Sequence, residues 1–279
     1  MFRRLSNSWE LARASANVLS ADKELVVFPI VSFVASLLVT ATFVLPMILV
    51  QGAEQKLTNG PLGIIVGFAF YTTTYFVIFF CNAALIGAAL IRLRGGDPTV
   101  ADGFRIASGK VGLILQYALI SATVGMFLRA IQERAGLLGR IVSGLFGMAW
   151  NLATFLAVPV LVSEEVGPLD AVKRSTSLLK QTWGEQVVGN FGIGTITSAI
   201  SFAIVVLFVP LGFVAVSSHS VPLMIAVGLA FVGALVAVGI VNATLSGIYT
   251  AALYQYAAEG TMGAGFSNDM VTNAFRPKG

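Results

Sequence analysis

The side chains with the most chemical potential in this sequence are amides and phenols inside long apolar stretches. These candidate polar-core residues are Asn82, Asn151, Asn190, Asn242, Tyr75 and Tyr249. A carboxamide donates and accepts hydrogen bonds at once, but it has no proton to exchange near neutral pH. Such groups can hold helices together, or they can line a polar cavity for a small solute. We take packing as the first interpretation and keep the cavity as the alternative.

Groups that normally carry catalysis or ion coupling are missing from these stretches. No Asp, Glu, Lys, Arg or His falls in the middle of any apolar segment, although ionisable residues inside spans commonly mark proton relays and ion paths. His219 is the only histidine and Cys81 is the only cysteine. The sequence contains no metal-ligand cluster, nucleophile–base pair or glycine-rich phosphate loop. We therefore expect no enzymatic activity, no cofactor and no proton-coupled transport.

The composition of the chain is that of a membrane protein. Hydrophobic residues make up 57% and charged residues 11%, whereas soluble proteins contain about 25% charged residues, and the mean hydropathy is +0.88. The net charge of +4 is small and its basic residues lie between the apolar segments. We interpret them as topology and lipid-headgroup signals and expect no nucleic-acid partner.

Six apolar segments are long enough to cross a hydrocarbon core, which takes about 20 helical residues. They lie near residues 25–50, 63–91, 111–131, 141–162, 187–216 and 221–256. The predicted fold class is therefore an all-α polytopic membrane protein with about six transmembrane helices. We expect an amphipathic interfacial helix over residues 1–24, a six-helix membrane domain over 25–258 and a cytoplasmic tail over 259–279.

The positions of lysine and arginine predict the orientation of these segments. Of the 17 lysines and arginines, thirteen fall on the side of both termini and four on the other. Both termini are therefore expected in the cytoplasm, because basic residues accumulate in cytoplasmic loops. The loop over residues 129–140 carries three arginines against this rule. There we expect Arg129 to pair with Glu133, four residues later on a helix.

Two cytoplasmic connectors are predicted to form amphipathic surface helices, near residues 97–108 and 167–184. In the first, Asp97 is the expected N-cap and Pro98 the first helical residue. In the second, Gly167 and Pro168 begin a helix that ends at Gly184. An apolar stripe of this second helix is expected at Val172, Leu179 and Trp183.

The second connector and the span before it carry a recognisable motif. Its residues are Pro159, Leu161, Val162, Glu164, Gly167, Ala171, Lys173, Arg174, Ser175, Leu179, Trp183 and Gly184. The motif resembles that of bacterial multi-span membrane proteins grouped as a domain of unknown function. More distantly, it is similar to the membrane domain attached to some glycerophosphoryl diester phosphodiesterases. The resemblance implies a bacterial inner-membrane helical protein. It does not imply phosphodiesterase activity, because the sequence contains no catalytic barrel.

Anchoring at the membrane surface is the role expected of this motif. Lys173 and Arg174 would contact anionic lipid headgroups on the cytoplasmic side or pair with Glu164. Trp183 would lie at the interface, where an amphipathic ring is favoured. The residues assigned to this surface-helix site are Glu164, Gly167, Pro168, Lys173, Arg174 and Trp183.

A short pattern, NAxLxG, occurs near the cytoplasmic ends of the second and sixth segments. It covers residues 82–87 and 242–247. Either the protein contains an internal repeat of helical hairpins, or the match arises from the abundance of alanine and glycine. Both alternatives remain open.

Three functional interpretations follow from these observations. The first is a non-enzymatic scaffold or membrane-organising factor that acts through lipids, membrane-protein partners or further copies of itself. The alternative is a channel or permease for a small neutral or amphipathic solute, without proton coupling. The third is a lipid-modifying enzyme that uses Glu164, Glu165 and Asp170. A water-filled cavity shared by the four asparagines would favour the permease, whereas pairing among polar residues would favour the scaffold.

Overall fold

The computed structural model of the chain describes residues 2–49, 60–134, 136–183, 193–261, 263 and 266. All regular secondary structure among these residues is helical. Six helical segments are long and apolar enough to span a membrane, namely Lys23–Leu49, Gly60–Leu93, Val111–Glu133, Gly139–Ser163, Ile200–Ser217 and Val221–Glu259. The chain is thus an all-α, multi-pass membrane protein, and the six predicted spans are confirmed.

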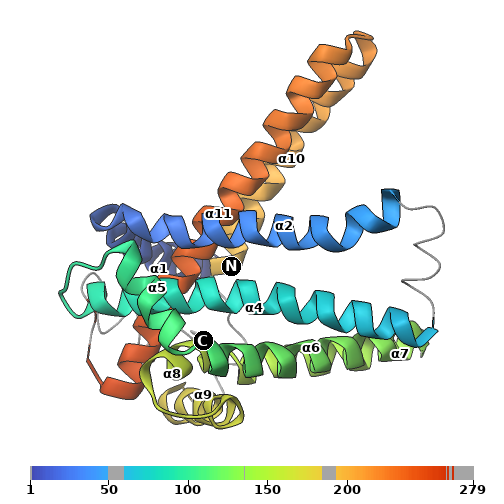
Figure 1. Cartoon of the computed structure of the whole chain (residues 1–279). Coiled ribbons are helices and arrows are strands. Elements are labelled where there is room, and N and C mark those ends of the chain that lie inside the picture. Colours follow the sequence, from blue (N-terminus) through green and yellow to red (C-terminus); the bar gives the residue numbers. More distant parts are fainter. Residues whose placement is uncertain are drawn as a thin grey trace.

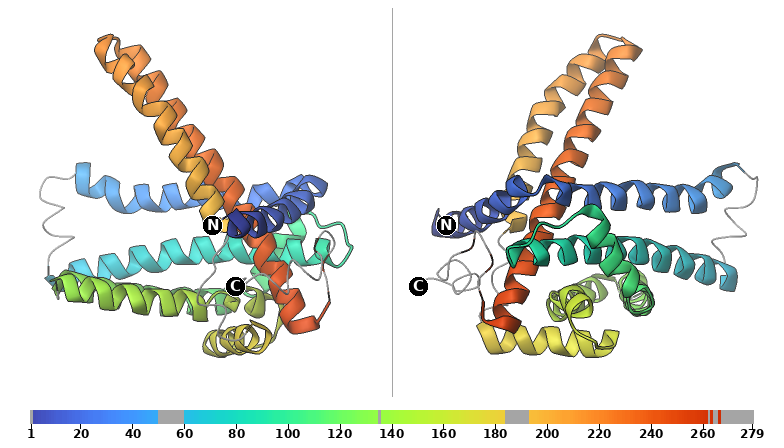
Figure 2. Two further views of the ribbon diagram at one scale, coloured as in Figure 1. Left: turned by 180° about the vertical axis from the view of Figure 1, so that it is seen from behind. Right: turned by 60° about the vertical axis from the view of Figure 1, so that its left-hand side comes forward.

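The helices form two groups that point in different directions. In chain order they are α1 (Phe2–Ala21), η1 (Lys23–Val26), α2 (Val27–Leu49), α4 (Gly60–Leu93), α5 (Val100–Gly109), α6 (Val111–Arg134), α7 (Gly136–Ala153), α8 (Ala157–Ser163), α9 (Pro168–Trp183), α10 (Ile193–Ser217) and α11 (Val221–Glu259). Helices α2, α4, α6 and α7 run side by side (Figure 1). Helices α10 and α11 form the predicted hairpin, which leaves this group at an angle in every view (Figure 2).

The fourth span is broken into two helices, and the proline at which the sequence predicts a kink, Pro159, lies next to the break. Turns at residues 154–156 separate α7 from α8. Pro159 explains the position of the break, because its ring clashes with the carbonyl four residues earlier, that of Phe155. Pro159 itself lies in the first turn of α8, where a missing N–H breaks no helical hydrogen bond.

The start of α5 also differs from the prediction. The helix begins at Val100 with Thr99 as its N-cap, so the assignment of Asp97 and Pro98 to this start was wrong. Thr99 Oγ1 accepts from the Asp102 N–H at 3.2 Å, and Asp102 Oδ2 accepts from the Thr99 N–H at 3.0 Å. This capping box satisfies two backbone donors, whereas a proline at the first helical position satisfies none.

The packed core lies at the end of the molecule where α1, α5, α8 and α9 gather (Figure 1). Ten residues in the last 13 of α4 are buried there, and so are nine of the last 16 of α11. Close approach of the backbones makes this core possible, because small residues let helices pack tightly. A Cβ on Gly103 of α5 would overlap the Phe28 ring and the Ala84 carbonyl, and one on Gly247 of α11 would overlap Leu85. We call this region the helix-end core.

Helices α1 and α9 both bury one face in this core. Helix α1 packs against α10 and α11, and α9 packs against α6, α7, α8 and α11. The buried residues of α9 are Pro168, Ala171, Ser175, Leu178 and Leu179. The predicted apolar stripe of α9 therefore includes the correct Leu179, but Val172 is only partly buried. The buried face of α9 includes Ala171 and Ser175, which the predicted stripe left out. Other helices of the protein cover this face.

Candidate functional site

The structure distributes the predicted polar-core residues over separate places. Asn82 of α4 lines a crevice, and Asn242 of α11 faces α10. Asn151 is exposed on α7, and Asn190 lies outside the described residues. The described asparagines therefore do not meet in one cavity.

Asn242 joins the two helices of the hairpin near its base. Its Oδ1 accepts a hydrogen bond from Thr197 Oγ1 of α10 at 2.5 Å. Both side chains line a cavity of about 250 Å³ that Ala12 of α1 also borders. This is the interhelical hydrogen bond expected of a packing role.

The tyrosines lie in packed surroundings. Tyr249 of α11 is buried at 7% exposure. Tyr75 of α4 stacks on Phe79 with ring centroids 5.6 Å apart, and Phe79 meets Tyr117 of α6 at 4.6 Å. Aromatic contacts of this kind stabilise helix pairs beyond the area they bury.

The ion pair predicted near the end of the third span is present. Arg129 Nε donates to Glu133 Oε1 at 2.8 Å, which confirms that prediction. The same guanidinium donates through Nη1 to the hydroxyl of Tyr71 at 2.9 Å. It thereby links α6 to α4, which the sequence did not indicate.

A crevice opens between α2, α4 and α11, and we call it the α2–α4–α11 crevice. Its volume is about 380 Å³. Four of its side chains carry heteroatoms: Ser32, Ser36, Cys81 and Asn82. The others are Pro29, Phe33, Ile78, Leu85, Val236, Gly239, Ile240 and Ala243. Its size and its apolar lining with a few polar groups are those of a small-molecule site.

The direction of the hairpin creates this crevice. Helix α11 lies tightly on α4 at Gly247, where Leu85 fills the space that a side chain would occupy. From there toward its N-terminus α11 turns away from α2 and α4 (Figure 2). The polar wall on α2 was missed from the sequence. Ser32 and Ser36 are one helical turn apart, and that spacing in an apolar segment was the available signal.

The motif around α9 forms a second cluster, which joins the broken span to α9 and α11. Ser175 Oγ accepts from the buried N–H of Leu156 at 3.0 Å, and this hydrogen bond spans the break. Glu164 Oε1 accepts from Arg174 Nε at 3.2 Å and from the Tyr254 hydroxyl at 3.3 Å. The roles of Ser175 and Tyr254 were not predicted, because both partners are distant in the sequence.

The charged residues of the motif have partners within the protein. Lys173 Nζ donates to Asp170 Oδ1 at 2.9 Å, and Lys110 Nζ donates to Glu165 Oε1 at 2.6 Å. Helix α9 begins at Pro168, as predicted, and Trp183 is its last residue, while Gly184 lies outside the described residues. Ala171 N–H donates to the carbonyl of Gly167 at 2.8 Å. Contact of Lys173 or Arg174 with lipid headgroups stays a prediction.

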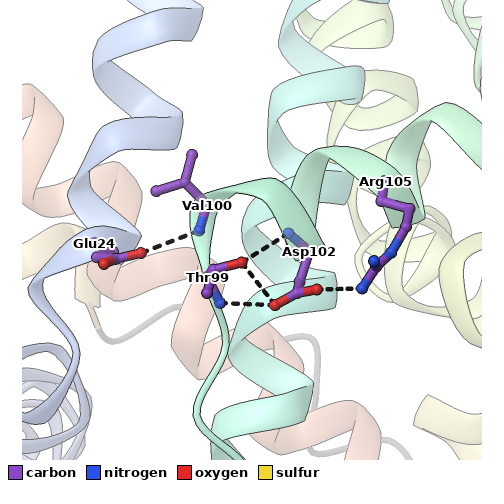
Figure 3. A network of polar contacts seen from close by, with 5 residues as sticks. All are labelled: Glu24, Thr99, Val100, Asp102 and Arg105. Carbon is purple, nitrogen blue, oxygen red and sulfur yellow. Dashed lines mark hydrogen bonds and ion pairs between the residues drawn. The ribbon is translucent and has the colours of Figure 1, made fainter.

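A third polar cluster holds α5 to the start of the first span (Figure 3). Glu24 Oε2 accepts from the Val100 N–H at 3.1 Å, alongside the capping box of Thr99 and Asp102. Hydrogen bonds from Thr99 and the nearby Arg105 hold the pKa of Asp102 below its usual range. Carboxylates and a hydroxyl thus occupy the free N–H groups at this helix start, which leaves little capacity for an external anion.

One buried carboxyl near this cluster is less well compensated. Asp22 is 5% exposed, and its Oδ2 has no hydrogen-bond partner among the described residues. Burial raises its pKa, although the guanidinium of Arg92 acts in the opposite direction. Within the described part of the chain, no three His, Cys, Asp or Glu side chains gather as metal ligands would.

With this geometry in view, a comparison with protein families identifies the family. A model described as a family of unknown function (DUF6159) matches residues 61–266. The chain belongs to this family. The match extends over α4 to α11, which includes the motif around α9 and two of the three walls of the crevice.

Membership of DUF6159 confirms the resemblance to an uncharacterised family and carries no activity with it. A comparison with curated proteins gives no match. The more distant resemblance to the membrane domain of phosphodiesterases stays a prediction.

Proposed function

We propose that this DUF6159 protein is a non-enzymatic membrane protein that organises its surroundings through contacts with lipids and membrane proteins. The observation that carries this proposal is the pairing of polar groups between helices at two places. Asn242 pairs with Thr197, and Glu164 pairs with Arg174 and Tyr254. Groups engaged in this way stabilise helix contacts, and in the described residues they form no polar route along the spans.

The α10–α11 hairpin supports the same proposal. Phe213 is 75% exposed and Leu229 is 69% exposed on its outer part. In a bilayer such side chains face lipid or another membrane protein, because neither helix has a neighbour there besides its own partner (Figure 1). A hairpin that projects sideways offers a large lateral surface for such contacts.

The acidic residues considered for a lipid-modifying enzyme give that alternative little support. Glu164, Glu165 and Asp170 pair with Arg174, Lys110 and Lys173 respectively. Carboxylates engaged with three different cations do not form a common reaction centre, since a general acid and base must reach the same substrate.

We further propose that the protein lies in the inner membrane of a bacterium with both termini in the cytoplasm. Helix α1 and the end of α11 lie at the same end of the molecule as α5 and α9 (Figure 1). Most lysines and arginines belong to these segments and their neighbours, which supports a cytoplasmic location for that end. The test is Asn59→Cys with Cys81→Ser. An impermeant thiol reagent should label intact cells from outside, and labelling only after permeabilisation would reverse the orientation.

The test of the function compares transport with association. In liposomes containing a pH dye, the purified protein should cause no solute-driven proton movement above the level of protein-free liposomes. After cross-linking in native membranes, a reproducible set of membrane proteins should copurify, and Phe213→Ala with Leu229→Ala should reduce their recovery. Proton movement that Asn82→Leu abolishes in a folded protein would replace this proposal by a carrier.

A further inference from the structure

We infer that the α10–α11 hairpin closes against α2 and α4, so that the α2–α4–α11 crevice is the open form of a longer helix interface. The hairpin then has two arrangements, and this structure contains the open one. The inference goes beyond the proposed function, because it concerns the movement of the hairpin, whatever partners the hairpin contacts.

The crevice continues an interface that is already formed at one of its ends. Leu85 of α4 lines the crevice and also fills the space beside Gly247 of α11, where a Cβ would overlap Leu85. On α11 the crevice is lined by Ala243 and Gly239, four and eight residues before Gly247. Residues four apart share one face of a helix. These two residues therefore extend the face of α11 that contacts α4 at Gly247.

The opposite walls show the same helical spacing. On α4 the crevice is lined by Cys81 and Ile78, four and seven residues before Leu85. On α2 it is lined by Ser32 and Ser36, one turn apart, and Ser32 contacts Cys81. Small residues on facing helices let their backbones approach closely, and van der Waals packing drives helix association in lipid. The serines of α2 and the glycine and alanine of α11 form two such faces.

The structure leaves Gly239 without the close contact that a glycine permits. No atom lies within 4 Å of where its Cβ would be, although a glycine inside a helix lowers stability relative to alanine. At Gly247 the absence of a side chain is used, because Leu85 occupies the position of a Cβ. Closing of the hairpin would place Gly239 against α2 as Gly247 lies against α4.

The pivot for this movement is the pair Ser246-Gly247, where α11 leaves α4. Pairs of glycine and serine are among the few sites at which helices bend sharply. After this pair, Ile248 and Leu253 are fully buried in the helix-end core. In the apolar window of α10 only 6% of the residues are buried and in that of α11 none, against 56% in α4. The core thus holds one half of α11, and little packing holds the hairpin in its open direction.

The lengths of the helices favour closing in a bilayer. From the contact of Leu85 with Gly247, α4 extends back 25 residues to Gly60 and α11 extends back 26 residues to Val221. At about 1.5 Å per residue each reaches roughly 38 Å, which exceeds a hydrocarbon core of about 30 Å. Parallel to α4, the hairpin would bring its polar turn at residues 217–220 to the surface where α4 begins. The inclination visible in Figure 2 shortens this reach, so closing moves the turn toward water.

Distances between two spin labels on the full-length protein in nanodiscs test this inference. The labels are attached at Leu45→Cys and Leu229→Cys in a Cys81→Ser background, because both leucines are exposed, at 49% and 69%. Excess unlabelled protein removes distances between molecules. Leu229 lies about 27 Å from the pivot, so a rotation of about 30° moves it by about 14 Å. The distances should therefore form two populations that differ by about 10 Å or more.

Two glycines of α11 provide a matched pair of variants for this measurement. Gly239 lines the crevice, Gly233 does not, and neither has an atom within 4 Å of where a Cβ would lie. Gly239→Leu fills the crevice and should abolish the population with the shorter distance, whereas Gly233→Leu should leave both populations unchanged. A distance distribution that Gly239→Leu does not change would overturn the inference.

Cross-linking in native membranes separates closing of the hairpin from insertion of a second copy. Ser36→Cys with Gly239→Cys, again with Cys81→Ser, should form a disulfide within one chain after mild oxidation, because closing brings the two Cα atoms within the roughly 7 Å that a disulfide spans. Ser36→Cys with Val238→Cys is the control and should form none, since Val238 lines the cavity beside α1. A disulfide-linked dimer in place of the intrachain bond would assign the crevice to a second copy and overturn the inference.

Discussion

The two halves of α11 differ in environment and in the polar residues they contain. Residues 221–241 of this helix carry side chains such as Val221 and Leu229, which are 63% and 69% exposed, whereas Leu253 near its other end is fully buried. Because lipid is as apolar as the interior of the protein, hydrophobicity alone does not decide which half is packed. The polar side chains of α11, such as Asn242 and Thr244, all lie in the half that is packed, whereas glycines occur in both halves.

The same division holds for the whole molecule. The helix-end core depends on close backbone approach and on specific hydrogen bonds, such as that from Leu156 N–H to Ser175. The outer hairpin depends on helix formation and on contact with lipid. Substitutions should therefore be costly in the core and tolerated in the hairpin.

The largest effect is expected where a side chain would overlap the backbone. Gly103→Leu should destabilise the protein by about 3 kcal/mol, the upper part of the range for overpacked cores, because Phe28 and the Ala84 carbonyl occupy the required space. Gly233→Leu in the hairpin is the control and should not lower the melting temperature in detergent. Equal melting temperatures for both variants would contradict the distinction between the two regions.

Loss of the hydrogen bond across the broken span should come next. Ser175→Ala leaves the buried N–H of Leu156 without its acceptor, which costs about 1–3 kcal/mol. Ser177→Ala on the same helix serves as the control for helix propensity. Thermal unfolding and protease protection of α9 would measure the effect, and a Ser175→Ala protein as stable as the control would show that water replaces the hydroxyl.

The cap of α5 should contribute less. Thr99→Ala removes half of the capping box and should cost about 1 kcal/mol. The pKa of Asp102 is lowered in the folded protein, so its contribution is present above its ordinary pKa and disappears as the pH falls through the lowered value. The difference in melting temperature between Thr99→Ala and the wild type should therefore shrink in strong acid. A difference independent of pH would exclude the carboxylate from the cap.

The smallest effect is expected at Asp22 and has the opposite sign. Its pKa is raised by burial, so the ionised carboxylate lowers stability at neutral pH, and protonation removes that penalty as the pH falls through the raised value. Asp22→Asn should raise the melting temperature slightly at pH 7 and lose this advantage toward pH 4. A decrease at pH 7 would show that attraction to Arg92 outweighs the cost of burial.

Much of the architecture follows from the sequence because it depends on neighbouring residues. The six spans follow from lengths of apolar segments, and the start of α9 follows from Pro168. The pair of Arg129 and Glu133 follows from their spacing on one helix. In each case the decisive partners are at most a few helical turns apart, so composition and spacing are sufficient.

Only the tertiary structure decides which faces are packed and which side chains meet. Glu164 and Tyr254 are 90 residues apart, and Glu24 and Val100 are 76 apart. The break at Pro159 could be expected from proline chemistry. That Ser175 accepts the hydrogen bond from the Leu156 N–H at this break could not. The crevice likewise depends on the direction in which α11 leaves α4. A lipid-facing and a protein-facing leucine look alike in the sequence, because both leave water for an equally apolar environment.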